Sequence, residues 1–145
     1  MNTPKPLTLE LKRCIRATPQ RLFEAWTTPE QLLAWWGPDG VRCVGAHVDL
    51  RVGGHYWIDN LLPDGRVVRI EGEFLRIEVN RTLIYTWRMP PDDSMHEEVC
   101  VQFEAQSEQT TELCITHTRI GNEATRQQHQ QGWQGCLDGL TAHMH

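Results

Sequence analysis

The first residues of the chain alternate between apolar and polar side chains. Leu7, Leu9, Leu11 and Ile15 fall on every second position, and Arg13 shares their register. A period of two is typical of a strand that buries one of its faces. We therefore predict that the chain begins with a strand.

Two helix starts follow this strand. Thr-Pro at 18–19 places a capping residue before a proline at the first helical position, and Thr-Pro-Glu at 28–30 repeats the signal. The Gly-Pro pair at 37–38 must end the second helix, because proline disfavours helix in the residue before it. We predict two short helices. The adjacent Trp35 and Trp36 should point to different sides of the second helix, so we expect at most one of them in the core.

Residues 41–118 have the pattern of six further strands. Turn signals stand at 53–54 (Gly-Gly), 63–65 (Pro-Asp-Gly) and 80–81 (Asn-Arg), and in the loop PPDDSM. Strands joined by such short turns pair antiparallel. The predicted strand segments are VRCVGAHVDL, HYWIDNL, RVVRIEGEFLRI, TLIYTW, EEVCVQFEA and TELCITHT.

The last segment changes to the period of a helix. Asn122 can cap it, and Trp133, Leu137, Leu140 and Met144 then share one face. Glycines at 132, 135 and 139 run along the flank of that face. Each glycine costs roughly 1 kcal/mol of helix propensity relative to alanine, so we expect a close backbone approach along this flank.

This order of elements predicts an α+β fold with a single domain over residues 1–145. A curved antiparallel sheet of about six to seven strands has one face to bury, and the C-terminal helix is the main element able to cover it. A strongly curved sheet cannot lie flush against a straight helix along its whole length. An apolar pocket should therefore remain between them, in the kind of concave space where small molecules bind.

Composition and charge narrow the class of protein. Hydrophobic residues make up 39% and charged residues 23% of the chain, as in globular proteins. The net charge of -5 and the lack of a long Lys/Arg cluster argue against a nucleic-acid partner. The longest apolar run, residues 32–36, is too short for a signal peptide or a membrane span. We expect a cytoplasmic protein without membrane contact.

The sequence predicts no metal and no cofactor. Its five cysteines, at 14, 43, 100, 114 and 136, form no CxxC pair and should be free thiols. His47, Asp49, His55 and Asp59 fit none of the usual zinc-ligand spacings. Asp49 precedes the Gly-Gly turn, so we expect it to be exposed or to stabilise that turn.

Several segments, in this order along the chain, together point to one known family. They are AWTTPEQLLAWWGPDG, DLRVGG, PDG, EGEF, LIYTW, ELCITHT and HQQGWQGCLDGL. These segments resemble the family of homologues of the heat-shock protein 90 ATPase activator. That family belongs to the START and birch-pollen-allergen superfamily (SRPBCC), so the resemblance implies its helix-grip fold. It also implies a hydrophobic ligand in the cavity, with scattered members acting as cyclases, dehydratases or hydrolases. The eukaryotic namesake has a further chaperone-binding domain for which this chain has no room, which argues against a chaperone partner.

Side-chain register selects the candidates for the pocket wall. On the helix, Trp133 and Leu137 lie four residues apart and share a face. On the strands the choice depends on register, because a slip of one residue would turn each named side chain outward. The candidate ligand-binding residues are Trp36, Tyr56, Ile58, Tyr85, Trp87, Phe103, His117, Trp133 and Leu137.

Three functions are compatible with these observations. The leading hypothesis is binding of a small hydrophobic molecule, with no catalytic residue assigned. The second is an enzyme that uses His117 as general acid or base and Tyr85 to orient the substrate, and the inward register would also let Tyr85 pair with His117. It ranks second because Glu71 and Glu73 fall out of the inward register, which leaves the pocket without a carboxylate. The third is a co-chaperone-like interaction module, and homodimer formation stays open.

We predict that all five cysteines are free in the folded protein, because none has disulfide-framework spacing. Thiol counting on freshly prepared protein, under denaturing but non-reducing conditions, should find five. A stable bridge would contradict the cytoplasmic assignment.

Overall fold

The computed structural model describes residues 6–38, 40–89 and 96–145. The elements follow the predicted order of a strand, two short helices, six strands and a long helix. The PPDDSM loop expected before the sixth strand lies outside the described residues. The elements are β1 (Leu7–Ile15), α1 (Pro19–Thr27), α2 (Pro29–Trp35), β2 (Arg42–Val48), β3 (His55–Leu61), β4 (Val67–Glu78), β5 (Thr82–Trp87), β6 (Glu97–Ser107), β7 (Thr110–Ile120) and α3 (Glu123–His143).

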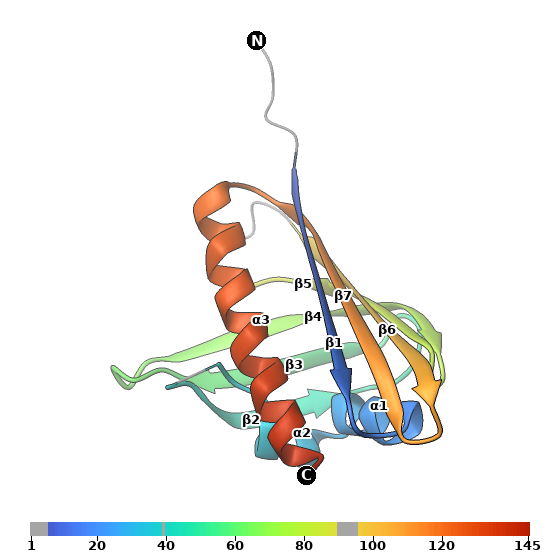
Figure 1. The fold of residues 1–145 in the computed structure, drawn as a ribbon. Helices are drawn as coiled ribbons and strands as arrows, with labels where there is room; N and C mark the ends of the chain where they lie inside the picture. Colours follow the sequence, from blue (N-terminus) through green and yellow to red (C-terminus); the bar gives the residue numbers. More distant parts are fainter. Residues whose placement is uncertain (1–5, 39, 90–95) are drawn as a thin grey trace.

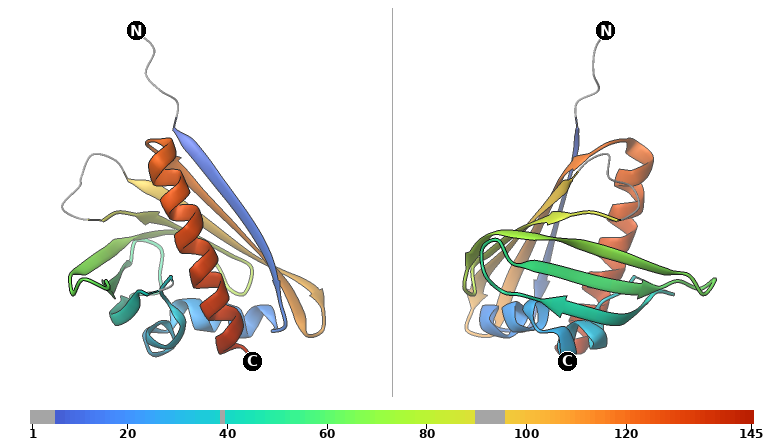
Figure 2. Two further views of the ribbon diagram at one scale, coloured as in Figure 1. Left: turned by 60° about the vertical axis from the view of Figure 1, so that its left-hand side comes forward. Right: turned by 180° about the vertical axis from the view of Figure 1, so that it is seen from behind.

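The seven strands form one antiparallel sheet in the order β1-β7-β6-β5-β4-β3-β2. The sheet curves around α3, and α1 and α2 lie beside the C-terminal end of that helix (Figure 1, Figure 2). This arrangement is the α+β helix-grip fold that the sequence predicts. Among the described residues, no helix is both long enough and apolar enough to cross a membrane.

Side-chain caps start two of the helices at the predicted positions. The Thr18 hydroxyl accepts a hydrogen bond from the Arg21 amide at 3.2 Å, before α1. The Asn122 side chain accepts one from the Thr125 amide at 2.8 Å, before α3. Each bond satisfies an amide that has no partner within its helix.

Both adjacent tryptophans lie in the core, so the prediction that at most one would be buried is wrong. Trp35 is 3% exposed and Trp36 is 5% exposed. The Trp35 indole donates to the Ala25 carbonyl at 2.8 Å, and the Trp36 indole donates to the Asn60 side chain at 3.0 Å. Trp36 follows the last helical residue and has extended backbone angles. The rotation of about 100° per residue that separates neighbours in a helix therefore does not apply to it.

Strand β4 changes partners along its length. Its first half pairs with β3, and its second half pairs with β5 from Phe74 onward, with a register shift in that pairing between Phe74 and Arg76. A Cβ on Gly72 would lie 2.0 Å from the Thr86 carbonyl oxygen, so the close approach of β5 requires glycine there. The part of β4 before this shift carries Val68 and borders the cavity described below.

Helix α3 packs on the sheet through the stripe that the sequence predicts, and all four residues of the stripe are buried. The glycine flank is not uniform. A Cβ on Gly139 would lie 2.5 Å from the Trp35 carbonyl oxygen, so the expected close backbone approach occurs here. A Cβ on Gly132 would meet nothing within 4 Å.

Alanine should therefore have opposite effects at these two glycines. Gly139→Ala should lower the free energy of unfolding by about 1–3 kcal/mol, because the methyl group forces α3 away from α2. Gly132→Ala should raise it by up to about 1 kcal/mol, because only the gain in helix propensity remains. Urea denaturation of the two variants measures both changes. Equal effects would contradict the contact at Gly139.

Candidate functional site

A cavity of about 510 Å³ lies between α3 and the part of the sheet formed by β3, β4 and the end of β5. This volume is in the range of small-molecule sites. The indole rings of Trp36, Trp87 and Trp133 form an aromatic wall, and Val68 and Ile70 add aliphatic surface from β4. The polar side chains on the wall include those of Asn60, Arg66, Gln128 and His129.

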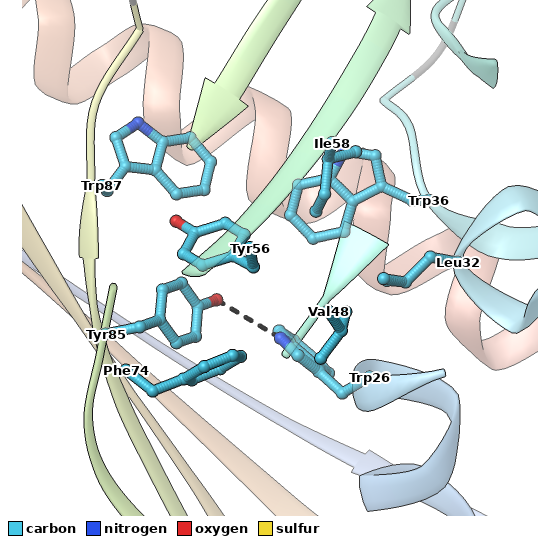
Figure 3. Close-up of a pocket in the computed structure, with 9 residues that line it drawn as sticks. All are labelled: Trp26, Leu32, Trp36, Val48, Tyr56, Ile58, Phe74, Tyr85 and Trp87. Atoms are coloured by element: carbon cyan, nitrogen blue, oxygen red, sulfur yellow. Dashed lines mark hydrogen bonds between the residues drawn. The ribbon is translucent and has the colours of Figure 1, made fainter. Parts of the chain in front are cut away.

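A much smaller void of about 20 Å³ lies next to the cavity, and Trp36 and Trp87 border both spaces. Figure 3 shows the side chains around the void. Its volume is enough for about one water molecule. The remaining residues of its wall are Trp26, Leu32, Val48, Tyr56, Ile58, Phe74 and Tyr85.

The candidate residues from the sequence are therefore distributed over several places. Three of them, all tryptophans, border the larger cavity. Tyr56, Ile58 and Tyr85 border the small void. Phe103 packs edge to face against Phe23 in the core. The other two candidates, the histidine of β7 and the leucine of α3, are also fully enclosed.

Three polar side chains from β6, β7 and α3 meet at the edge of the cavity. The carboxylate oxygen Oε1 of Glu97 lies 2.7 Å from Nε2 of His117 and 2.7 Å from Nε2 of His129. The two imidazole rings stack with centroids 4.4 Å apart. His117 is completely buried, His129 is 8% exposed, and the Glu97 side chain is 17% exposed. Of the three, His129 borders the cavity.

Trp133 decides where His117 carries its proton. The indole Nε1 of Trp133 donates a hydrogen bond to Nδ1 of His117 at 3.0 Å. Because an indole N–H can only donate, Nδ1 must offer a lone pair. The proton of the neutral ring is then on Nε2, from which it is donated to Glu97. Both nitrogens of His117 are engaged, so this residue has no site left for exchanging a proton with a ligand.

Burial and hydrogen bonds set the charges of this cluster. Burial lowers the pKa of His117, although the hydrogen bond to Glu97 acts in the opposite direction. The lowered pKa keeps the His117 ring neutral. Burial alone would raise the pKa of Glu97, but hydrogen bonds from His117 and His129 lower it to about 2. Glu97 is therefore a carboxylate at neutral pH.

The two histidines and Glu97 are close enough together to be tested as a metal site. Their ligand atoms lie within 4.8 Å of one another, which holds for no other such group among the described residues. A metal on Nε2 of His117 would need the lone pair there and would move the proton to Nδ1, facing the Trp133 N–H. Metal-bound histidines instead donate their second N–H to an acceptor. The cluster therefore fits a metal poorly.

Three of the four residues considered for a metal site from the sequence have other partners. Asp49 pairs with Arg51 at 2.9 Å, and Asp59 pairs with Arg69 at 2.7 Å. The imidazole of His47 stacks on a neighbouring tryptophan. All five cysteines are free. Burial raises the pKa of Cys136, on the cavity wall, to about 12, so its thiol is not a nucleophile at neutral pH.

Two expectations about polar groups are wrong. The hydroxyl of Tyr85 does not pair with His117; it accepts a hydrogen bond from the Trp26 indole at 3.2 Å (Figure 3). Tyr85 lies two strands away from His117, with Val99 of β6 between them. The inner side also does not lack a carboxylate, because Glu97 supplies one. Glu97 stands two residues before the buried Val99, so the alternation of that strand already carried the signal.

One buried donor on the cavity wall has no acceptor. Nε1 of Trp87 is the single buried side-chain nitrogen or oxygen without a hydrogen-bond partner in the described part of the chain. The ring lies edge to face against both histidines of the cluster, with centroids 5.1 and 5.7 Å away. Leaving such a donor unpaired costs about 1–3 kcal/mol.

The fold and the site define a class of protein: a helix-grip α+β protein with a cavity between its sheet and its long helix. The chain belongs to the family described as activator of Hsp90 ATPase homolog 1-like protein, whose model matches residues 16–145. This confirms the resemblance found in the sequence. A search of curated proteins finds no match.

Solved structures agree with this assignment. A Chromobacterium violaceum protein is 26% identical with a TM-score of 0.86, covering 94% of this chain and 96% of that one. The AHSA1 protein of Silicibacter pomeroyi is 23% identical with a TM-score of 0.82, covering 94% and 96%. An HSP90 activator from Plasmodium falciparum is 24% identical with a TM-score of 0.74, covering 94% of both chains. The last two comparisons establish the fold alone.

Glu97 should make stability depend on pH. Because its pKa is about 2 in the folded protein and near 4.5 in an unfolded chain, it contributes stability above about pH 4.5 that is lost as pH falls toward 2. Glu97→Gln has no charge to lose. Between about pH 6 and pH 2, wild type should lose up to about 3 kcal/mol more unfolding free energy than this variant. Urea titrations at several pH values measure the difference, and parallel pH curves would contradict the assigned charge.

Proposed function

We propose that this protein binds a small, largely apolar, ring-containing molecule in the cavity of about 510 Å³. The observation that carries the proposal is the wall of that cavity, where Trp36, Trp87 and Trp133 lie side by side. Aromatic side chains bind flat ligands through stacked and edge-to-face contacts, each of which adds about 0.5–1.5 kcal/mol beyond the burial of area.

A further feature supports a ligand rather than an empty defect of packing. The void behind the tryptophans holds only about 20 Å³, so the aromatic core next to the cavity is otherwise well filled.

Adjacent valines of β4 offer a matched test. Val68 borders the cavity, whereas Val67 is 55% exposed and belongs to the opposite register of the strand. An apolar fluorescent dye should bind wild type with a dissociation constant in the micromolar range, about 8 kcal/mol of binding free energy. Val68→Trp should fill the cavity and weaken binding at least about tenfold. Val67→Trp should bind the dye like wild type.

Fluorescence titration of the three proteins measures these affinities, and urea denaturation checks that each one is folded. Failure of apolar dyes to bind wild type would contradict the proposal. A co-chaperone-like interaction would then be the better hypothesis, since an HSP90 activator shares the fold. Retention of an Hsp90-type chaperone in a pulldown would support that alternative.

A further inference from the structure

We propose that Glu97 and His129 form a carboxylate–imidazole pair whose second nitrogen, Nδ1 of His129, binds and deprotonates an acidic hydroxyl group of the molecule in the cavity. The ligand would then be an apolar ring compound that carries a phenol or an enol. This inference rests on the proposed function, because the pair acts on a molecule held against the tryptophan wall.

The position of His129 carries the inference. Its ring is more than nine-tenths buried, yet it borders the cavity. Its Nε2 is engaged with Glu97 at 2.7 Å. Nδ1 has no hydrogen-bond partner among the described residues. It is also not fully buried, in contrast to the unpaired nitrogen of Trp87, so it remains accessible. A buried ring at the cavity wall, with one nitrogen fixed and the other without a partner among the described residues, is suited to receive a polar group of a ligand.

Glu97 determines what that open nitrogen can do. As a carboxylate it only accepts hydrogen bonds, so the ring of His129 must keep its proton on Nε2. In the neutral ring, Nδ1 then has a lone pair. If Nδ1 gains a proton, the resulting imidazolium is stabilised by the adjacent carboxylate, as in other carboxylate–histidine pairs that serve as general bases.

The second histidine of the cluster does not compete for this role. His117 has its Nδ1 occupied by the Trp133 indole and its Nε2 by Glu97. It orients the carboxylate from the buried side, while His129 contacts it from the cavity side. Among the described residues that line the cavity, His129 is the one imidazole.

The proton transfer involves only the ligand hydroxyl and Nδ1 of His129. The O–H bond of the ligand breaks, its electron pair stays on the oxygen, and an N–H bond forms at Nδ1 of His129. The products are an oxyanion and an imidazolium, which remain paired next to Glu97. No oxidant, metal or further reactant takes part. The tryptophan wall covers one face of the ligand ring, and the lower local dielectric there strengthens this ion pair.

A pair of matched probes tests the inference. 4-Nitrophenol has an acidic hydroxyl, whereas 4-nitroanisole has a methyl ether in its place and cannot donate. In a mildly acidic buffer that keeps free nitrophenol mostly neutral, wild type should bind the phenol about tenfold more tightly than the ether. The visible absorbance of the bound phenol should show the ionised form.

Three variants assign the effect to the pair. His129→Phe keeps an aromatic ring but should bind both probes equally, without ionising the phenol. Glu97→Gln should still bind the phenol but with a much smaller ionised fraction, because the imidazolium loses its counter-charge. Gln130→Ala, on the exposed side of α3, should behave like wild type. If His129→Phe does not fold, the ¹⁵N NMR signal of Nδ1 in wild type replaces it, and this signal should shift when nitrophenol is added.

The outcomes separate this inference from the proposed function. If the apolar dye binds but wild type does not prefer the phenol, the inference fails and the cavity function stands. If the preference persists in His129→Phe, or if the Nδ1 signal does not respond, the acceptor is elsewhere and the inference also fails. If neither the dye nor either probe binds, the proposed function fails first.

Discussion

The hydrogen bond from the Trp133 indole to Nδ1 of His117 is the constraint on which the rest of the site depends. It joins α3 to β7 in the core, where neither group can exchange its partner for water. Because the indole can only donate, the bond fixes the proton of His117 on Nε2 and directs it to Glu97. The same bond makes the cluster a poor metal site.

The consequence extends to the residue at the cavity. Glu97 Oε1 accepts from two imidazoles at equal distances, yet the two rings are not equivalent. His117 has hydrogen-bond partners at both ring nitrogens and holds the Glu97 carboxylate in place. His129 has a partner at one ring nitrogen and lines the cavity. A buried polar network of this kind is most stable when all its members are paired, and Nδ1 of His129 is the one imidazole nitrogen of the cluster without a partner among the described residues.

Local pattern was sufficient to predict the fold, because periodicity and capping act over a few residues. The strand alternation, the caps of α1 and α3 and the stripe on α3 all appear as expected. The patterns also placed His129 four residues before Trp133, and Glu97 two residues before Val99, on the inward faces. Both residues were missed because a polar residue within an apolar series appears to break the pattern unless its partner is known. Glu97 and His129 are 32 residues apart, so the local pattern of neither one indicates the other.

The division of the aromatic residues between two spaces was beyond prediction for a different reason. Alternation states which face of a strand a side chain occupies, but the location of open space depends on how far the sheet departs from the helix. Along β4, Gly72 stands between the residues that border the two spaces, and the Thr86 carbonyl of β5 approaches it closely. Apolar residues on either side of this point have the same pattern in the sequence, yet Val68 borders the cavity while Phe74 borders the small void. The apolar wall can then supply affinity for many ring compounds, whereas the single open nitrogen at its edge can select among them, since a buried polar contact discriminates between ligands more sharply than apolar area does.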